Sequence, residues 1–414
     1  MLKGPIARAT IRTSFVLGLR LVVQAGTLLL VARMLGPEQF GAFAGVAALA
    51  VLMGAFSTFG THLVLLGEVA KQAVRRNQIL TYAAPTALLC GTALFFIFVL
   101  ICINIFNIKQ VSINVIVCIG LAEFVFLPLF TLPATEQLGL GKTARSQLLS
   151  TMPLALRTLW AGAVLLIAPS NPLALFSYGY LITAVLAIVF VGWYIPSAWG
   201  AVSQWRLPTA PQLRHSAGYA AIALTNIAPS ELDKALAAKL LPLGAAGLYA
   251  ASTRAVAAVT LPVMAMMLAA LPRLFRDSEA SSNQSKRFLR WLFIAGSLYG
   301  LMIAAVLWLV APLFEQLFGS KYEGISDTLR WLCLAAPALG LRMAAGNTLM
   351  ALGKPWLRTG FELVGILALV ITAIFFTQIY GTTGMSVALI SAEWSMAAIG
   401  WGLIYLNANK NIIT

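Results

Sequence analysis

Long apolar runs alternate with short polar breaks along the whole chain. The runs reach or exceed the roughly 20 residues that a helix needs to cross a bilayer. They lack the alternation over roughly 10 residues that is typical of a barrel strand. We therefore expect an all-α integral membrane protein with twelve transmembrane helices. The predicted spans are residues 11–32, 40–66, 80–104, 112–133, 148–168, 172–195, 216–241, 247–272, 289–314, 326–351, 358–379 and 383–406.

The first strong break lies between the first two runs and reads ARMLGPEQFGAFA, ending at Ala44. Gly36-Pro37 within it is a turn signal, because proline fixes its own φ and disfavours helix in the residue before it. This stretch predicts the tight turn of a transmembrane hairpin.

The same pattern returns half a chain later. LLPLGAAGLYAAS follows the seventh run, and at an offset of 206 residues Gly41 falls on Gly247. A second pair, LGLGK after the fourth run and LMALGK after the tenth, aligns at an offset of 212 residues. The repeats predict a duplicated six-helix unit, with domains at residues 1–200 and 201–414 and a linker near 196–215. With six spans per half, we expect parallel repeats related by a pseudo-two-fold axis along the membrane normal.

Composition agrees with a membrane protein, since 60% of the 414 residues are hydrophobic and 10% are charged, against about 25% charged in soluble domains. The four cysteines all lie in apolar runs without metal-ligand spacing, and we interpret them as packing residues. They are Cys90, Cys102, Cys118 and Cys333. No P-loop, zinc-ligand cluster or GxSxG motif occurs. We expect no enzyme, no cofactor and no metal site.

The net charge of +15 is explained by topology rather than by nucleic acid. Of the basic residues outside the spans or near their ends, eighteen lie on the side of the N-terminus. The four on the other side are Arg33, Lys109, Lys239 and Lys321. The positive-inside rule then predicts that both termini are cytoplasmic, and no nucleic-acid partner is needed.

The four motifs resemble those of polysaccharide flippases, the O-antigen-type members of the multidrug/oligosaccharidyl-lipid/polysaccharide (MOP) exporter superfamily. The resemblance implies two six-helix bundles around a cavity that opens alternately to each side of a bacterial inner membrane. It also implies an anionic cargo, an oligosaccharide on undecaprenyl pyrophosphate, moved from the cytoplasmic to the outer leaflet. Membrane lipids, a glycan polymerase and chain-length proteins are the implied partners.

Six basic residues fall inside predicted spans, where a charge is costly and normally faces a cavity or a partner. They are Arg20, Arg157, Lys234, Arg254, Arg330 and Arg342. Arg20, Gln24 and Thr27 share one helix face. Guanidinium suits phosphate because it binds two oxygens at once and stays charged. We therefore predict a cationic cargo site from Arg20, Gln24, Arg157, Lys234, Arg254 and Arg342. Snorkelling and local ion pairing, for instance of Lys234 with Asp233 or Glu231, are the alternatives.

Acidic residues inside the spans are fewer. For Glu123, Asp233 and Glu393 we expect either proton coupling or ion pairing with the arginines.

Three other functions are compatible with this length and charge. A cation-coupled multidrug exporter of the same superfamily would be expected to carry more acid in its spans, since basic residues repel a cationic drug. A lipid II flippase would usually have two more helices. A non-transporting scaffold for glycan assembly would be expected to expose docking segments, whereas the loops here are short.

Overall fold

The computed structural model of the chain describes residues 5–104, 111–277 and 282–410. Within these residues the secondary structure is helical and no strand occurs. Seven stretches are long and apolar enough to cross a membrane, and two of them, residues 18–54 and 356–406, are too long for a single crossing. The chain is a multi-pass membrane protein.

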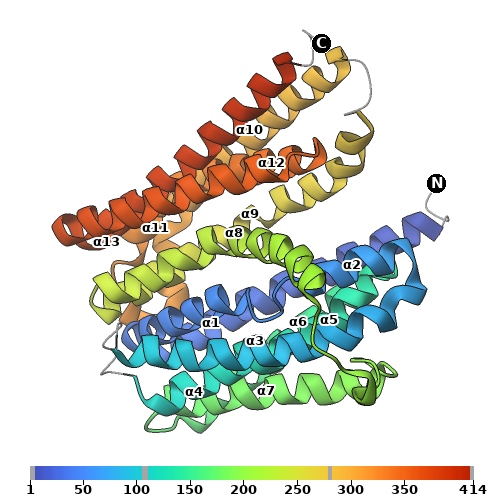
Figure 1. Cartoon of the computed structure of the whole chain (residues 1–414). Helices are drawn as coiled ribbons and strands as arrows, with labels where there is room; N and C mark the ends of the chain where they lie inside the picture. Colours follow the sequence, from blue (N-terminus) through green and yellow to red (C-terminus); the bar gives the residue numbers. More distant parts are fainter. Residues whose placement is uncertain (1–4, 105–110, 278–281, 411–414) are drawn as a thin grey trace. The chain divides into compact units, whose positions relative to one another are not determined.

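Helices α1 to α7 form the first half of the described chain (Figure 1). They are α1 (Pro5–Gly54), α2 (Thr61–Lys71), α3 (Arg76–Asn104), α4 (Ile113–Leu121), α5 (Leu127–Gly139), α6 (Thr143–Ile167) and α7 (Pro172–Tyr194). A π-helical turn, Ala122–Phe126, joins α4 to α5, and short 3₁₀ turns lie at Ala73–Arg75 and Val202–Gln204.

Six further helices complete the described chain. They are α8 (Ala210–Leu240), α9 (Leu243–Asp277), α10 (Ser282–Phe318), α11 (Ile325–Leu332), α12 (Ala336–Ala351) and α13 (Pro355–Lys410). Two 3₁₀ turns flank α11, at Ser320–Tyr322 and Cys333–Ala335.

Two glycines divide the longest helices into hairpins. Gly36 breaks α1 with a φ of 71°, and Gly381 breaks α13 with a φ of 55°. Positive φ is accessible to glycine and costly for most other residues, so each long helix becomes two spans. α2 continues the second span, α4 and α5 together form the fourth, and α11 and α12 together form the tenth. The twelve predicted spans are therefore confirmed.

Contacts group the chain into two compact units. Unit 1 contains residues 1–35 and 42–227, and unit 2 contains residues 36–41 and 228–414. The domain boundary expected near residue 200 stays a prediction, because contact grouping measures packing rather than the extent of a duplication. Both chain ends, for which we expect a cytoplasmic location, lie outside the described residues, as do Lys3 and Lys109.

In unit 1, α2 packs against α5 and α3, while α4 and α6 each pack against α7. α5 also contacts α6, so the spans of this unit form one connected bundle. Cys102 and Cys118 are buried as free thiols within it. Their predicted role as packing residues is confirmed.

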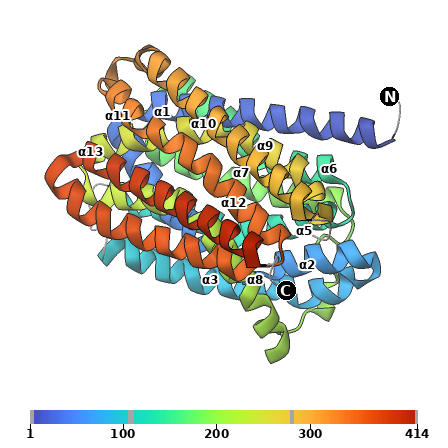
Figure 2. The ribbon, with the colours of Figure 1, turned by 90° about the horizontal axis from the view of Figure 1, so that it is seen from above.

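In unit 2, α12 packs against both α10 and α13, and the three helices run side by side in Figure 2. A buried cluster joins α9, α11 and α13 around Tyr249, Leu332 and Met385, and it includes the free thiol of Cys333. Small residues such as Ala246 and Ala388 fill its narrow parts, which is how helices approach closely inside a membrane.

The two lysine-ending motifs fold into the same turn. Gly141 and Gly353 have φ values of 73° and 69°. Lys142 N donates to Gln137 O at 2.9 Å, and Lys354 N donates to Leu349 O at 2.9 Å. Both are Schellman helix ends, in which a left-handed glycine lets two late N–H groups reach back to the last turn. This repeat is therefore structural as well as sequential.

The hairpin motifs also meet each other, inside unit 2. A methyl group on Gly41 would collide with the carbonyl oxygen of Leu243, and one on Gly247 would collide with that of Pro37. Leu243 is the repeat equivalent of Pro37, so the contact is reciprocal. The repeated glycines allow the two backbones to touch.

Candidate functional site

Arg20 lies on α1 and reaches a polar residue of α6 in unit 1. Its Nη1 donates to Gln147 Oε1 at 2.9 Å, and two turns further along α1 the Thr27 hydroxyl bonds to the Thr158 hydroxyl. Arg20 and Gln24 are both exposed. Gln147 is neutral, so the charge of Arg20 stays available to an anion.

Arg157 lies at the centre of a buried cluster contributed by three elements of unit 1. Its Nη2 lies 3.5 Å from Glu123 Oε1, its Cζ lies 3.4 Å from the ring centroid of Tyr180, and the Tyr180 hydroxyl donates to Glu123. The carboxylate and the ring hold the guanidinium from two sides. Nevertheless Arg157 Nε and Nη2 are buried without a hydrogen-bond partner among the described residues.

Glu123 is positioned by the π-helical turn Ala122–Phe126. Gly91 of α3 abuts this turn so closely that a Cβ there would collide with Phe124 O. π-turns shift the register of a helix by one residue and occur often at functional sites. Here the turn places Glu123 beside Arg157 and Tyr180.

Arg342 and Glu393 form a buried ion pair in unit 2, between α12 and α13. Arg342 Nε donates to Glu393 Oε2 at 2.7 Å, and the two side chains are 8% and 1% exposed. Such a pair must stay together, because removing either partner leaves an uncompensated buried charge.

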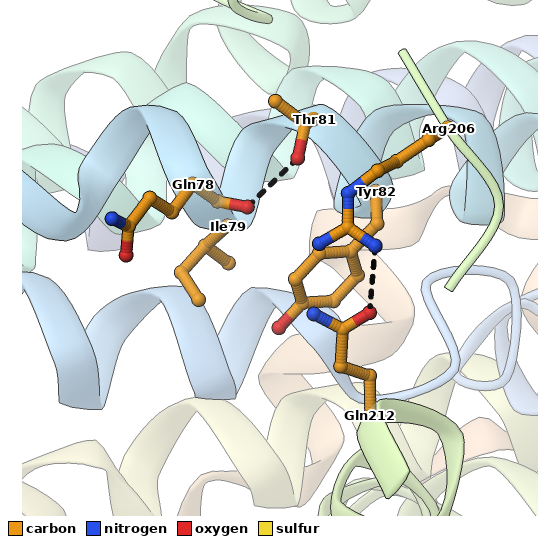
Figure 3. A pocket seen from close by; sticks show the side chains of 6 residues that line it. All are labelled: Gln78, Ile79, Thr81, Tyr82, Arg206 and Gln212. Carbon is orange, nitrogen blue, oxygen red and sulfur yellow. Dashed lines mark hydrogen bonds between the residues drawn. The ribbon is translucent and has the colours of Figure 1, made fainter. Parts of the chain in front are cut away.

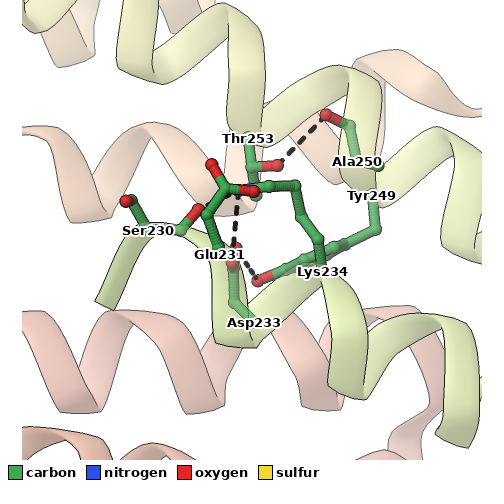
Figure 4. Close-up of polar contacts among 7 residues, drawn as sticks. All are labelled: Ser230, Glu231, Asp233, Lys234, Tyr249, Ala250 and Thr253. Carbon is green, nitrogen blue, oxygen red and sulfur yellow. Dashed lines mark hydrogen bonds and ion pairs between the residues drawn. The ribbon is translucent and has the colours of Figure 1, made fainter. Parts of the chain in front are cut away.

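Lys234 is enclosed by oxygen atoms from its own helix, α8 (Figure 4). Its Nζ lies 3.4 Å from Asp233 Oδ1 and 3.5 Å from Glu231 Oε2, and it donates to the carbonyl of Ser230. Tyr249 of α9 donates to Asp233 Oδ2 at 3.2 Å. The ammonium group is therefore neutralised locally, the alternative that the sequence left open.

Arg254 is the exception in unit 2. It is half-buried, its Cζ lies 6.0 Å from the ring centroid of Phe40, and no carboxylate pairs with it within the described part of the chain. Arg254 thus resembles Arg20 in keeping its charge uncompensated.

A model of polysaccharide biosynthesis proteins matches residues 6–278, about two thirds of the sequence. The chain belongs to this family. No curated protein sequence matches the chain.

Solved structures agree on the fold of this protein. An inward-facing multidrug resistance MATE transporter of the MOP superfamily superposes with a TM-score of 0.76 at 13% identity, covering 94% of this chain and 96% of that one. Lipid II flippase MurJ, in an inward closed conformation, gives 0.73 at 14% identity, with coverage of 95% and 87%. A MOP transporter from Pyrococcus furiosus, for which reverse polarity of the binding pocket suggests a different function, gives 0.68 at 16% identity, with coverage of 99% and 98%. These relatives are transporters and flippases rather than enzymes.

The predicted site residues fall into separate groups. In unit 1, Arg20 and Gln24 lie on α1, while Arg157 and Glu123 form the cluster with Tyr180. In unit 2, Arg342 pairs with Glu393, Lys234 pairs with Asp233, and Arg254 pairs with neither. Each of the three acids lies within ion-pair distance of a basic residue, and whether its role is ion pairing or proton coupling stays a prediction. The role of these residues in cargo binding stays a prediction.

Sequence reasoning missed several polar partners of the predicted site residues. Gln147 and Thr158, on α6, face α1, and a signal for them existed, since Gln147, Thr151 and Thr158 recur at helical spacing. Tyr180 gave no comparable signal, because a single tyrosine in an apolar run more often packs in a core. Among the described residues, no group of three potential metal ligands occurs.

Proposed function

We propose that this protein translocates undecaprenyl-pyrophosphate-linked oligosaccharide repeat units from the cytoplasmic to the outer leaflet of a bacterial inner membrane, for surface polysaccharide synthesis. The observation that carries the proposal is the state of the arginines in unit 1. Among the described residues, Arg20 is exposed and hydrogen-bonds to the neutral amide of Gln147, and Arg157 Nε and Nη2 are buried without a hydrogen-bond partner, although Nη2 lies 3.5 Å from Glu123 Oε1. Pyrophosphate supplies the acceptor oxygens that such donors lack.

The sequence of events follows from where these charges lie. Arg20 and Gln24 attract and bind the diphosphate, and Arg157 takes up phosphate oxygens through Nε and Nη2 once the cargo enters. Guanidinium groups suit this task because they stay charged at any physiological pH. Alternating access of the two units then exposes the cargo to the outer side. Both termini remain cytoplasmic in this topology.

Glu123 is our candidate for proton coupling. It already balances Arg157 and accepts a hydrogen bond from Tyr180. A cargo phosphate that replaces Glu123 as the partner of Arg157 would favour protonation of the carboxyl, because like charges disfavour the charged form. Proton uptake and cargo binding would then be linked.

Cells that lack this protein but retain their glycosyltransferases provide the test. Complete lipid-linked repeat units should accumulate in the cytoplasmic leaflet and surface glycan should be lost. Intact surface glycan together with altered sensitivity to cationic drugs would instead favour a multidrug exporter.

The variant Arg20→Ala distinguishes a flippase from a scaffold for glycan polymerase and chain-length proteins. A scaffold keeps supporting glycan synthesis when this arginine is removed at unchanged protein level. A flippase loses its surface glycan.

A further inference from the structure

A polar pocket of about 360 Å³ lies in unit 1 where the segment before α8 folds back onto the start of α3 (Figure 3). Residues from both segments line the pocket, and none of them carries a carboxylate. The lining residues are Gln78, Ile79, Thr81, Tyr82, Arg206 and Gln212. The flippase mechanism above uses none of them.

The pocket is held by backbone and ring contacts rather than by the polar side chains alone. Arg206 N donates to Thr81 O at 2.9 Å. Upstream, Trp205 Nε1 donates to Trp199 O at 3.1 Å, and Trp199 Nε1 donates to Leu129 O of α5 at 2.9 Å. The segment that carries Arg206 is thus fixed to two helices, and the position of the guanidinium follows from the fold.

The lining presents donors to the pocket. Arg206 lies over the ring of Tyr82, with Cζ 5.8 Å from its centroid, and Nη1 donates to Gln212 Oε1 at 3.3 Å. That oxygen also accepts from Thr209 N at 2.9 Å. Because the acceptor atom of Gln212 is occupied, its amide N–H groups and the remaining guanidinium N–H groups are left for a ligand. Acceptor oxygens of an anion match this set.

The neighbouring basic residues form ion pairs with carboxylates, whereas Arg206 does not within the described residues. Lys71 and Arg75 both bind Glu68. Hydrogen bonds from Lys71 and Arg75 hold the pKa of Glu68 below its usual value, so that the carboxylate stays charged. Arg76 Nε lies 2.8 Å from Glu136 Oε1. Among the described residues, no carboxylate pairs with Arg206.

We propose that this pocket binds the phosphate of a membrane lipid in the cytoplasmic leaflet, with Arg206 as the phosphate ligand and Gln212 as its orienting partner. The start of α3 lies at headgroup depth in the topology expected from the positive-inside rule. Beside the pocket, Val202 and Leu207 are 70% and 66% exposed, as expected for apolar residues that enter the interface next to a bound headgroup. A phosphodiester of an anionic phospholipid and the pyrophosphate of the lipid carrier share this chemistry.

Direct binding to the full-length protein in detergent tests the site, with short-chain phosphatidylglycerol, short-chain phosphatidylcholine and undecaprenyl pyrophosphate as probes. Arg206→Gln should weaken binding of at least one anionic probe by about tenfold or more, because a charged bidentate ligand is lost. Arg214→Gln is the matched control, since Arg214 is also exposed on the N-terminal part of α8 but does not line the pocket. Equal losses in the two variants would overturn the proposal in favour of diffuse surface charge.

The probes separate the two sources of phosphate. Selective loss of phosphatidylglycerol binding identifies a resident phospholipid, and selective loss of undecaprenyl pyrophosphate binding identifies a reception site for the carrier. Gln212→Ala leaves the charge in place and should weaken the same probe by a smaller factor, with an unchanged unfolding temperature. Undiminished binding of all three probes by both variants would refute the site, and translocation need not change for the proposal to stand.

Discussion

The two units share duplicated turns but treat their buried charges differently. In unit 2, Arg342 and Lys234 are enclosed and paired with carboxylates. Among the described residues of unit 1, Arg20 is exposed and hydrogen-bonds to Gln147, and Arg157 lies beside Glu123 while its Nε and Nη2 make no hydrogen bond. A charge whose partner is fixed holds a fold together, whereas a charge with free donors can bind cargo. Under the proposed function, unit 2 therefore holds most of the structural charge and unit 1 holds most of the charge that binds cargo.

What the duplication preserved is backbone geometry. The Schellman turns at Gly141 and Gly353 have matching hydrogen bonds, and Gly41 and Gly247 make reciprocal contacts. Few residues other than glycine allow two backbones to approach so closely. A buried charged pair, in contrast, can be replaced by two apolar residues together. Packing was retained in both copies and charge diverged.

The largest expected effect is on the buried pair of unit 2. Arg342→Ala should destabilise the protein by about 3–5 kcal/mol, because Glu393 would remain buried without a partner. Thermal unfolding of the purified protein measures this. Arg342→Met combined with Glu393→Leu should recover most of the loss. A stable Arg342→Ala protein would mean that the pair is not structural, and the contrast between the units would fail.

The next largest loss of stability is expected where the two hairpin motifs contact each other. Gly41→Ala and Gly247→Ala should each cost about 1–3 kcal/mol, since each new methyl group meets a carbonyl oxygen. Similar losses are expected because the contacts are equivalent. Gly244→Ala is the control, as its methyl group would enter open space. If Gly244→Ala were as damaging as the other two, helix composition rather than backbone contact would explain the result.

The duplicated turns should respond alike and less strongly. Gly141→Ala and Gly353→Ala should each cost about 1–2 kcal/mol, because alanine is strained at positive φ. Asparagine at either position should cost less, since it tolerates this conformation. Gly360→Ala, in a helix interior with open space around it, should not destabilise. Unequal losses at the two turns would show that only one of them retains its role.

The smallest effect on stability is expected at Arg20. Arg20→Ala should change the free energy of unfolding by less than about 0.5 kcal/mol, because the side chain is exposed and its partner is neutral. The unfolding temperature of the purified variant provides the measurement. A loss comparable to that of Arg342→Ala would place Arg20 among the structural charges.

The sequence predicted the spans well because hydrophobic run length responds directly to bilayer thickness. It predicted the hairpin turn because Gly36-Pro37 is a local signal, and the repeats because two short motifs align at nearly the same offset. These features depend on neighbouring residues. They need no knowledge of which helices touch.

Partners of the charged residues were less predictable. Arg342 and Glu393 are 51 residues apart, and no periodicity links two helices. The contact of Tyr180 with Glu123 depends on a π-helical turn that no pattern in the sequence predicts. Local pairing of Lys234 was foreseen because its acids are one and three residues away. The pocket at Arg206 was missed because it depends on how the linker folds back.

Flipping of undecaprenyl-pyrophosphate-linked oligosaccharide in reconstituted vesicles tests the central claim most directly, using Arg20→Gln, Arg20→Lys and wild type at equal protein content. The account predicts at least about a tenfold slower rate for Arg20→Gln, partial activity for Arg20→Lys, and unfolding temperatures equal to wild type. Wild-type rates in Arg20→Gln would contradict it, because the uncompensated charge of unit 1 would then have no part in recognising the cargo.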